Sequence, residues 1–396
     1  MNDRPEENVL DVARRLNERV LSPLKRSFVG KDEVLDLLGI ALIAGENLFL
    51  YGPPGTAKSA LVRSVAERID ATSFEYLLTR FTEPNEVFGP FDIRRLREGE
   101  LVTNTANMLP EADLVFLDEL LNANSAILNS LLTVLNERRL RRGRETLDLP
   151  VLSVIGASNR LPEDETLGAL FDRFLVRVRC DNVEGDRLDE VLSAGWALER
   201  RTARGTQPTV SIDELRAAQS ALTTVELNPV RPEFGRCVAR IRQAGIAVSD
   251  RRAVKLQRLV AASALMCGRT EARRDDLWVL RYTWETAEQE QVLAGLIAAE
   301  LADVDETSSE THPLARRGDR PNAEHIAAEL DQMLERVAAG LDARERVSAI
   351  DRLALLEARC EWIENEVSRT QLLERTAALW TQLGSGFRPP SSDANV

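Results

Sequence analysis

Hydrophobic and polar positions in the first half of the chain follow the pattern of an α/β domain. Residues 7–27 repeat apolar side chains at the spacing of one helix face. Five short apolar runs then have the length of buried strands: Asn47–Tyr51, Phe74–Leu78, Leu114–Asp118, Val151–Ala157 and Phe174–Arg179. Helical patterns lie between them, at Ser59–Ile69 and Ser125–Asn136. Strands that alternate with helices predict a parallel sheet in a three-layer α/β domain.

Two polar segments interrupt this alternation and predict inserted hairpins. The first pairs Phe91–Leu96 with Glu100–Thr105 around a turn at Arg97-Glu98-Gly99. The second covers Arg139–Leu147 around Arg142-Gly143. Polar clusters that contain glycine are typical of such turns.

The second half of the chain has only helical periodicity. Residues 184–207 predict a connecting helix, and the helical pattern then runs from about Ser211 to about Ala302. A polar linker over 305–322 leads to two further helices, Ala323–Ala339 and Asp342–Leu383. We therefore expect four parts: an α/β core over 1–183, a connecting helix with an all-α domain over 184–303, a helical extension over 304–388 and a disordered tail over 389–396.

Composition narrows the class of protein. The 396 residues include 51 Lys and Arg against 64 Asp and Glu, a net charge of −13 that argues against bulk binding to a phosphate backbone. The longest apolar run, Leu37–Ala44, is far shorter than a membrane span, and the acidic N-terminus predicts no secretory signal. The four cysteines are isolated, which favours free thiols in a cytoplasmic protein, and two histidines exclude most histidine-based catalysis.

The first chemical motif is the run Gly52-Pro53-Pro54-Gly55-Thr56-Ala57-Lys58-Ser59. It follows an apolar strand and opens a helix, which is the context of a phosphate-binding loop. Backbone N–H groups of such a loop converge on an anion, Lys58 would reach the terminal phosphates, and the Ser59 hydroxyl would ligate magnesium. The alternative is an ordinary strand–helix turn. Ala57 stands where glycine is usual, and its methyl group narrows the approach to phosphate.

The second motif is the pair of carboxylates that ends the run Leu114–Asp118. Asp118 is placed to hold the magnesium shell, and Glu119 to polarise an attacking water. The alternative is the solvated start of a loop.

Three weaker candidates follow. Asn159, at the end of another apolar run, could bridge a γ-phosphate and the water, or be a turn residue. Arg173 could enter a neighbouring nucleotide site as a finger, or pair with Asp172 at the surface. Arg251 could touch phosphates, although Ser249 and Asp250 beside it are also typical of a helix cap.

Taken together, these residues resemble an AAA+ ATPase of the MoxR family, and within it the RavA-like branch. The resemblance rests on three further groups of residues, in order and at matching spacing. They are Glu75–Phe81 with Pro84 and Glu86–Pro90, then Leu109–Ala112, then Ala126–Asn129, Leu131–Thr133 and Asn136–Arg138. The resemblance covers residues 10–290. Ala before the lysine is common in this family, so Ala57 fits the subgroup.

The resemblance implies a role for each candidate residue. Lys58 and Ser59 match Walker A, Asp118 and Glu119 match Walker B, and Asn159 matches sensor 1. Arg173 matches the arginine finger and Arg251 the sensor 2 arginine, with its action on its own or a neighbour's nucleotide left open. Phe28-Val29-Gly30 matches the segment that lines the adenine.

The family also implies an architecture and an assembly. It predicts an AAA+ three-layer core with a parallel sheet, followed by an all-α lid, here with a helical C-terminal extension. The cofactors it implies are ATP and Mg²⁺, the assembly is a homo-oligomeric ring, a hexamer by family precedent, and the partner is a von Willebrand factor A domain protein. RavA-like proteins continue with a helical arm and a compact β-rich domain, whereas residues 305–383 here read as helical only.

Three functions are compatible with these features. The first is an ATP-driven machine with chaperone-like remodelling or maturation of its partner. The second is a slow nucleotide-dependent assembly switch. The third is a nucleic-acid motor, suggested by the basic run Arg138–Arg144 and disfavoured by the net charge of −13. The long C-terminal helices, with Trp362, Trp380 and a leucine-rich face at Leu353, Leu355 and Leu356, either pack on one another or dock a partner.

Overall fold

The computed structural model describes most of the chain. The described residues are 5–98, 102–142, 145–162, 165–183, 187–202, 208–302, 310–316, 323–341, 343–360 and 366–383. The predicted tail over 389–396 lies outside them. Within the described residues, no helix combines the length and apolar character that crossing a bilayer requires.

A sheet of five parallel strands forms the centre of the first half, as the apolar runs predict. The strands are β1 (Leu48–Tyr51), β2 (Ser73–Leu77), β3 (Leu114–Asp118), β6 (Ser153–Ser158) and β7 (Val176–Arg179), in the spatial order β2-β3-β6-β1-β7. The strands β1, β3 and β6 are almost wholly buried, which explains why they read as continuous apolar runs in the sequence.

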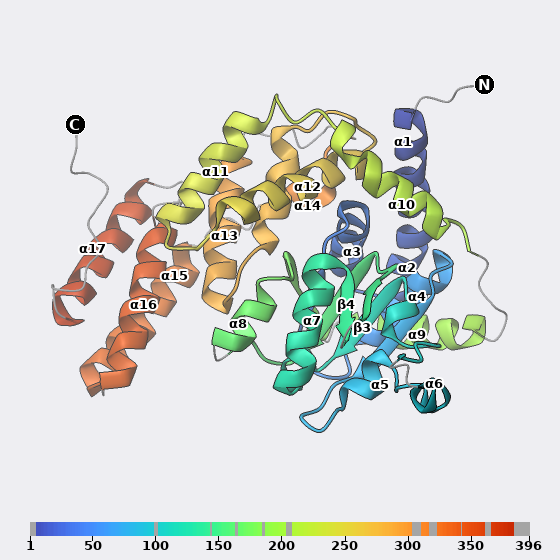
Figure 1. Ribbon diagram of the computed structural model, residues 1–396. Coiled ribbons are helices and arrows are strands. Elements are labelled where there is room, and N and C mark those ends of the chain that lie inside the picture. Colours follow the sequence, from blue (N-terminus) through green and yellow to red (C-terminus); the bar gives the residue numbers. More distant parts are fainter. Residues whose placement is uncertain are drawn as a thin grey trace.

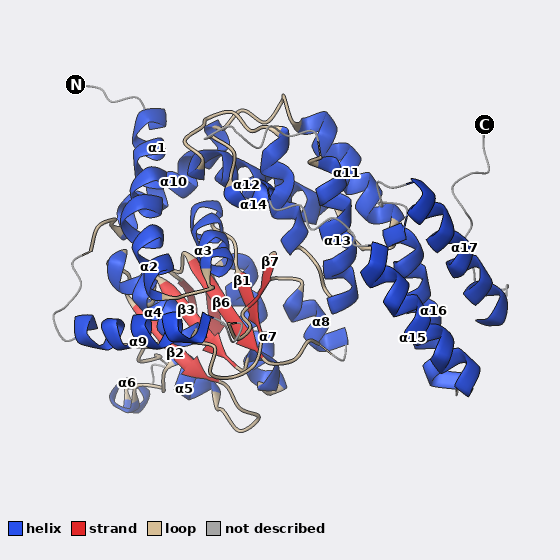
Figure 2. Cartoon of the chain, turned by 180° about the vertical axis from the view of Figure 1, so that it is seen from behind, coloured by secondary structure: helices blue, strands red, loops and turns tan. Residues whose placement is uncertain are grey.

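Helices cover both faces of the sheet and complete the three layers (Figures 1 and 2). One face carries α2 (Ser22–Ser27), α3 (Asp32–Ala44) and α4 (Lys58–Arg68); the other carries α7 (Ser125–Glu137) and α8 (Glu165–Phe171). Parallel strands need crossover connections, which these helices provide. Because each crossover is right-handed, its direction along the sheet decides which face its helix covers. The predicted N-terminal helix is continuous but has a π-helical turn, with α1 (Pro5–Arg15) and η1 (Leu16–Leu21) before α2.

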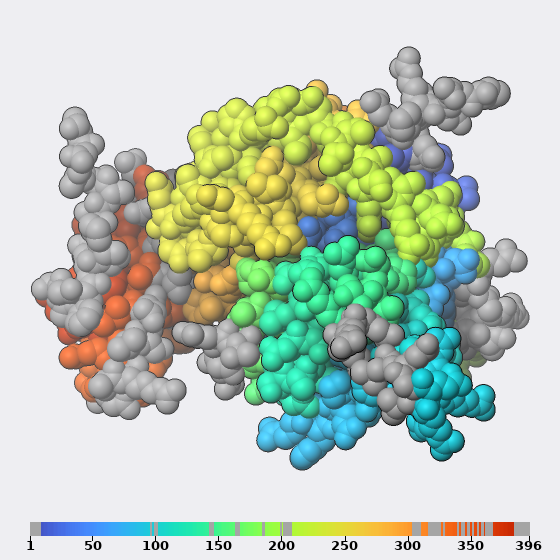
Figure 3. Space-filling model, viewed as in Figure 1, coloured from blue at the N-terminus to red at the C-terminus, as the bar shows by residue number. Residues whose placement is uncertain are grey.

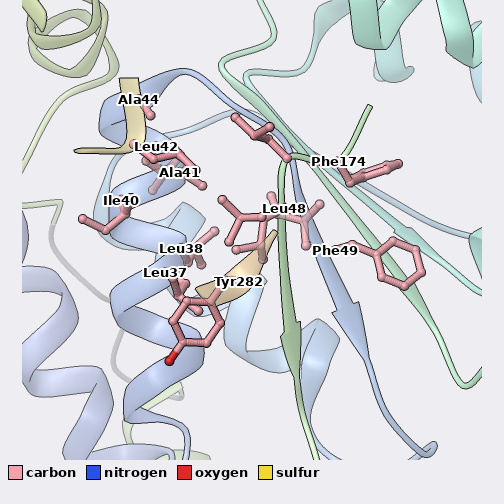
Figure 4. Close-up of a cluster of buried hydrophobic side chains, with 14 of the residues drawn as sticks. Leu37, Leu38, Ile40, Ala41, Leu42, Ala44, Leu48, Phe49, Phe174 and Tyr282 are labelled. Carbon is pink, nitrogen blue, oxygen red and sulfur yellow. The ribbon is translucent and has the colours of Figure 1, made fainter. Parts of the chain in front are cut away.

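The packing of α3 on β1 shows how the sequence builds this core. Figure 4 shows Leu37, Leu38 and Ala41 of α3 directed toward Leu48 of β1, with Phe49 on the other side of the strand. The rings of Phe171 and Phe174 meet Phe49 edge to face at 4.8 and 5.6 Å between ring centroids. Buried aromatic pairs of this kind add to the free energy of burial.

One of the two inserted hairpins is confirmed and the other is wrong. The strands β4 (Arg139–Arg142) and β5 (Glu145–Asp148) pair antiparallel, as predicted. In the first insertion, the predicted strand Phe91–Leu96 is instead the helix α6 (Ile93–Arg97), and among the described residues of the insertion an isolated antiparallel bridge joins Phe91 to Thr103. Asp92 caps this helix, since its carboxylate accepts the N–H groups of Arg94 and Arg95.

Short helices complete this half of the molecule. They are α5 (Pro84–Phe88), η2 (Leu109–Glu111) and η3 (Leu120–Asn122).

The following segment is helical, as expected. Its elements are α9 (Leu188–Thr202), α10 (Ile212–Ala221), η5 (Leu222–Thr224), α11 (Arg231–Gln243), α12 (Asp250–Met266), η6 (Arg274–Tyr282) and α13 (Ala287–Glu300). Within the stretch 305–322, which was predicted to be a linker, the structure instead has a short helix, α14 (Pro313–Arg316), packed on η6. Helix α12 packs on α3, and α10 packs on α1 and α3, so this all-α segment is joined to the core through α3 and the N-terminal helix.

The C-terminal helices form a bundle that the sequence analysis resolves only in part. Helix α15 (Ala323–Ala339) has the predicted bounds, but the single helix expected over Asp342–Leu383 is two helices, α16 (Ala343–Cys360) and α17 (Glu366–Leu383). They fold back on each other, and Trp380 Nε1 donates to Glu357 Oε2 at 2.7 Å. A straight helix would leave its apolar face uncovered, whereas the bundle buries it. Figure 3 shows these helices in orange and red at one end of the molecule.

Candidate functional site

The carboxyl ends of the central strands bring the main candidate residues to one edge of the sheet. Tyr51 at the end of β1 lies level with Ser158 at the end of β6, and Gly52 N–H donates to Ser158 O at 3.1 Å. Strand β3, which ends at Asp118, is the next neighbour of β6. Crevices at this edge are where open parallel sheets bind ligands.

The loop Gly52–Ala57 turns from β1 into α4 with two residues in the left-handed region. Gly55 has φ +82°, and Ala57 has φ 63° at the cap of α4. The Oγ1 of Thr56 donates to the carbonyl of Pro53 at 3.1 Å and closes the loop on itself. Pro53, Pro54 and Gly55 are exposed at the tip, so backbone groups of the loop are open to a ligand.

Lys58 is held inside this loop. Its side chain is almost buried, and Nζ donates to the carbonyls of Gly52 at 2.9 Å and Pro53 at 2.8 Å. The cation therefore lies at the centre of the loop, beside the amino end of α4, where a helix favours an anion. The half-buried Ser59 follows it in the first turn of α4.

Glu119 follows β3 in a strained backbone conformation. Its φ of 50° is rare for a residue with a side chain and turns the chain sharply after Asp118. Burial and the neighbouring Asp118 carboxylate raise the pKa of Glu119, while Lys58 and Arg160 act in the opposite direction. Because β1 and β3 both neighbour β6 and end on the same side of the sheet, the loop Gly52–Ala57 and the carboxylate pair Asp118–Glu119 lie on that side together.

Two residues that the sequence analysis missed surround Glu119. Asn122 Nδ2 donates to Glu119 Oε2 at 3.3 Å, and Arg160 Nη2 donates to Asn122 Oδ1 at 2.9 Å. Arg160 also donates to the carbonyl of Leu121 at 3.0 Å. Asn159 is exposed beside Arg160 at the end of β6, at the same edge. The position of Arg160 directly after Asn159 was the only feature in the sequence that could have drawn attention to it.

The segment Phe28–Gly30 lies against the chain that leaves β7. Gly30 has φ +70°, and a Cβ there would meet Val183 Cγ2 at 3.0 Å. The next residue, Lys31, donates from Nζ to the carbonyl of Asp181. Because Cys180 N–H donates to Tyr51 O at 2.8 Å, this segment lies on the phosphate-loop side of the sheet, with Val29 half-buried.

The structure places Arg173 and Arg251 at the opposite edge of the sheet. Arg173 precedes β7, whose first residue, Val176, is level with Leu48 at the start of β1. Strands rise by about 3.3 Å per residue, so the length of β1 separates this edge from the phosphate-binding loop by roughly 13 Å. Arg251 is exposed in the first turn of α12, and its neighbour Arg252 contacts Asp172 at 3.1 Å, which places Arg251 at the same edge.

The residues at the loop edge suit a magnesium ion that arrives with a nucleotide. The described residues contain no group of three or more His, Cys, Asp or Glu side chains that could hold a metal alone. Magnesium in nucleotide sites takes only one or two protein oxygens and completes its shell with phosphate and water. Ser59 on α4 and Asp118 on β3 offer that number, on two elements that pack together.

Comparison with known proteins agrees with this geometry. Residues 14–220 match the model of the MoxR domain in the MoxR-vWA-beta-propeller ternary systems, and residues 231–297 match that of an AAA lid domain. The first match spans more than half of the chain.

Individual relatives extend the comparison. An uncharacterised protein of Methanocaldococcus jannaschii, MJ0812, is 35% identical over 268 residues, which cover 67% of this chain and 70% of that protein. The chaperone MoxR1 of Mycobacterium tuberculosis is 27% identical over 165 residues, 41% of this chain and 43% of its own length. A crystal structure from Cytophaga hutchinsonii, described as a "putative ATPase", superposes with a TM-score of 0.59 at 19% identity, covering 76% of this chain and 97% of that one.

Proposed function

The chain belongs to the MoxR family of AAA ATPases, and we propose that it hydrolyses ATP in a ring of identical subunits to remodel or mature a partner protein. The observation that carries this proposal is the division of the candidate residues between two edges of the sheet. Lys58 and Glu119 lie at one edge, and Arg173 and Arg251 at the other. A complete set of these candidate residues would form where the side of one subunit that carries Arg173 and Arg251 meets the side of the next subunit that carries Lys58, as in a hexameric ring.

Each residue of the loop edge has a chemical task in this proposal. The N–H groups of the loop and Lys58 bind the terminal phosphates, and Val29 and Gly30 line the adenine. Ser59 and Asp118 hold Mg²⁺, which neutralises phosphate charge. Glu119 polarises a water whose oxygen attacks the γ-phosphorus while the bond to the β-phosphate oxygen breaks, and Asn159 orients this water. The products are ADP, phosphate and a proton.

Arg173 and Arg251 would serve the nucleotide of the adjacent subunit. A finger of this kind stabilises the charge on the transferred phosphoryl group and contributes about 10³-fold or more to turnover. Because both arginines lie far from their own loop, we assign both to action between subunits. Changes in nucleotide state would then alter the angle between core and lid around the ring.

The nature of the partner follows from the family. The matching model describes MoxR domains that occur with vWA and β-propeller proteins, so we propose a von Willebrand factor A domain protein as the substrate of remodelling. The name of the relative MoxR1 supports a chaperone-like role. We place the reaction in the cytoplasm, where the four free cysteines stay reduced.

The test is ATP turnover per subunit as a function of protein concentration, with magnesium present. We expect the rate to rise steeply and saturate, because a finger supplied by a neighbour makes each site depend on assembly. Lys58→Ala should lose nucleotide binding, whereas Glu119→Gln should keep binding, stabilise the ring and stop turnover. A flat rate from particles shown to be monomers, or wild-type turnover by Glu119→Gln, would contradict the proposal.

A further inference from the structure

One carboxylate joins the candidate finger to the lid. Asp172 Oδ2 accepts a hydrogen bond from Arg173 Nη1 at 2.9 Å, and Asp172 Oδ1 accepts one from Arg252 Nη1 at 3.1 Å. Arg173 belongs to the core, just before β7, while Arg252 is in the first turn of the lid helix α12. The two oxygens of the Asp172 side chain therefore bridge two parts of the molecule, since Asp172 and Arg252 are 80 residues apart in sequence.

Arg252 itself is fixed from several directions. Its side chain is only 6% exposed, and Nη2 donates to the carbonyl of Thr283 at 2.7 Å. Nη1 also contacts the carboxylate of Glu285. A buried guanidinium is tolerated only when its hydrogen bonds are largely satisfied, so Arg252 has little freedom to move. The backbone of the exposed Arg251, one residue earlier, is consequently held on the same turn of α12.

A second buried arginine immobilises the backbone that carries the finger. Arg177 is fully buried, and it donates to the carbonyls of Phe171 at 2.9 Å and Trp284 at 2.7 Å. On the other side, Asn47 Nδ2 donates to the carbonyl of Arg173 at 3.0 Å. The backbone of Phe171–Arg173 is therefore rigid, and the direction of the Arg173 side chain is left to Asp172.

We propose that Asp172 and Arg252 are positioning residues that orient Arg173 and make its orientation depend on the docking of α12. Arg173 and Arg251 then act as one unit on the nucleotide of the neighbouring subunit, and a movement of the lid moves both. The inference rests on the proposed function, since it gives the finger a mechanical link to the lid of its own subunit.

The test compares Asp172→Asn with the wild-type full-length protein under assembled conditions. The substitution keeps the shape of the side chain and removes the charge that holds both arginines. Misplacing a group that acts in the transition state costs about tenfold to a hundredfold in rate. We expect a loss of that size in kcat, with the KM for ATP and the Kd of a fluorescent ATP analogue unchanged within about twofold.

A double substitution separates positioning from a merely structural role. If Asp172 acts through Arg173, then Asp172→Asn should lower kcat no further in an Arg173→Ala background. Arg252→Lys, which keeps the charge but loses the forked geometry, should reproduce the loss and serves as the test variant if Asp172→Asn does not assemble. Lys255→Gln is the matched control: Lys255 also joins α12 to the core, through Glu46 at 3.1 Å, but does not contact the finger, and its kcat should be unchanged.

The outcomes distinguish this inference from the function on which it rests. Full kcat in Arg173→Ala would remove the finger from the proposed mechanism. A loss in Arg173→Ala without a loss in Asp172→Asn, or a gain in Asp172→Asn, would overturn the positioning role alone. An equal loss in Lys255→Gln would mean that any loosening of the lid lowers turnover, which would also overturn it.

Discussion

At the scale of single residues, the absence of a side chain at Gly52 lets the loop Gly52–Ala57 close against the end of β7. A Cβ on Gly52 would lie 2.3 Å from the carbonyl oxygen of Cys180, which is backbone and cannot move aside cheaply. Cys180 is in turn fixed by its N–H bond to Tyr51 O. Gly52, the first glycine of the motif, is therefore required because the end of β1 lies so close to Cys180, in addition to the room that a ligand would need.

We predict that Gly52→Ala lowers stability and weakens nucleotide binding together. The added methyl group must separate the ends of β1 and β7, a strain that costs about 1–3 kcal/mol by analogy with other overpacked sites. Thermal unfolding and titration with a fluorescent ATP analogue measure the two effects. The matched control is Gly235→Ala in the exposed interior of α11, where nothing lies within 4 Å of the new Cβ and the stability should rise slightly. Equal behaviour of the two variants would contradict the argument.

The motif residues could be predicted from the sequence because each belongs to a short run with a fixed local geometry. Lys58 and Glu119 are read from their own strand–loop contexts. Asp172 and Arg252 could not be paired in this way, since their contact depends on how the lid docks on the core. Arg177 interrupts an apolar strand, and nothing in the sequence says that distant carbonyls at Thr283 and Trp284 satisfy it.

At the scale of elements, one ion pair ties the N-terminal helix α1 to helix α10. Glu214 forms the capping box of α10 with Ser211, and it also accepts a hydrogen bond from Arg15 of α1 at 2.6 Å. The bond from Arg15 and the N–H of Ser211 lower the pKa of Glu214 below its usual 4.5. A carboxylate whose pKa is lower in the folded state stabilises the fold above the unfolded pKa, and this contribution disappears as the pH falls through the folded pKa.

We therefore expect Glu214→Gln to be destabilising near neutral pH and nearly neutral in acid. The loss should be about 1 kcal/mol at pH 7, the usual size for a capping interaction. Thermal unfolding of both proteins from pH 7 to below pH 4 would show the difference narrowing. Glu190→Gln changes the net charge equally but removes an exposed pair between α9 and Arg187, the residue just before that helix, so it should show little effect at any pH. A pH-independent difference for Glu214→Gln would refute the assignment.

Element prediction succeeded where burial dictates the pattern and failed where it does not. The strands β1, β3 and β6 and the hairpin β4–β5 follow from apolar runs and a glycine turn. The segment around Ile93 is largely exposed, so its polar pattern fits a strand or a helix, and the local cap by Asp92 decides for α6. The prediction of one long helix over Asp342–Leu383 is wrong because helical periodicity continues through both α16 and α17. The reversal of direction between the two helices depends on how they pack.

At the scale of the whole molecule, the net charge and the ion pairs of the β4–β5 hairpin argue against nucleic-acid binding. Two described arginines of the β4–β5 hairpin have acidic partners: Arg139 pairs with Asp148 of β5 at 2.7 Å, and Arg141 pairs with Glu137 at the end of α7 at 3.0 Å. With a net charge of −13 for the chain, these pairs leave little local field to attract a phosphate backbone. Two cations of the basic run that suggested a nucleic-acid motor are thus paired with carboxylates of this chain.

The molecule is stabilised by two separate clusters of buried apolar side chains. The larger one runs through the core and the lid and ends with Leu314 and Ala315 of α14. The smaller one contains side chains of α15, α16 and α17 only, among them Leu353 and Trp380. The bundle meets the lid where α16 packs on α13. Two clusters of this kind favour parts that fold independently.

We predict that a chain cut after Arg316 remains folded and binds ATP as tightly as the full chain. The cut removes the smaller cluster and keeps the larger one whole, so thermal unfolding should stay cooperative with a modest loss of stability where α13 loses its cover. A cut after Ala302 is the control. It also removes Leu314 and His312, whose ring stacks on Trp278 with 4.3 Å between centroids, and it should unfold at a clearly lower temperature. If the longer fragment failed to fold or to bind nucleotide, the bundle would be part of the core rather than an appended unit, and its docking on α13 would have to be considered part of the ATPase itself.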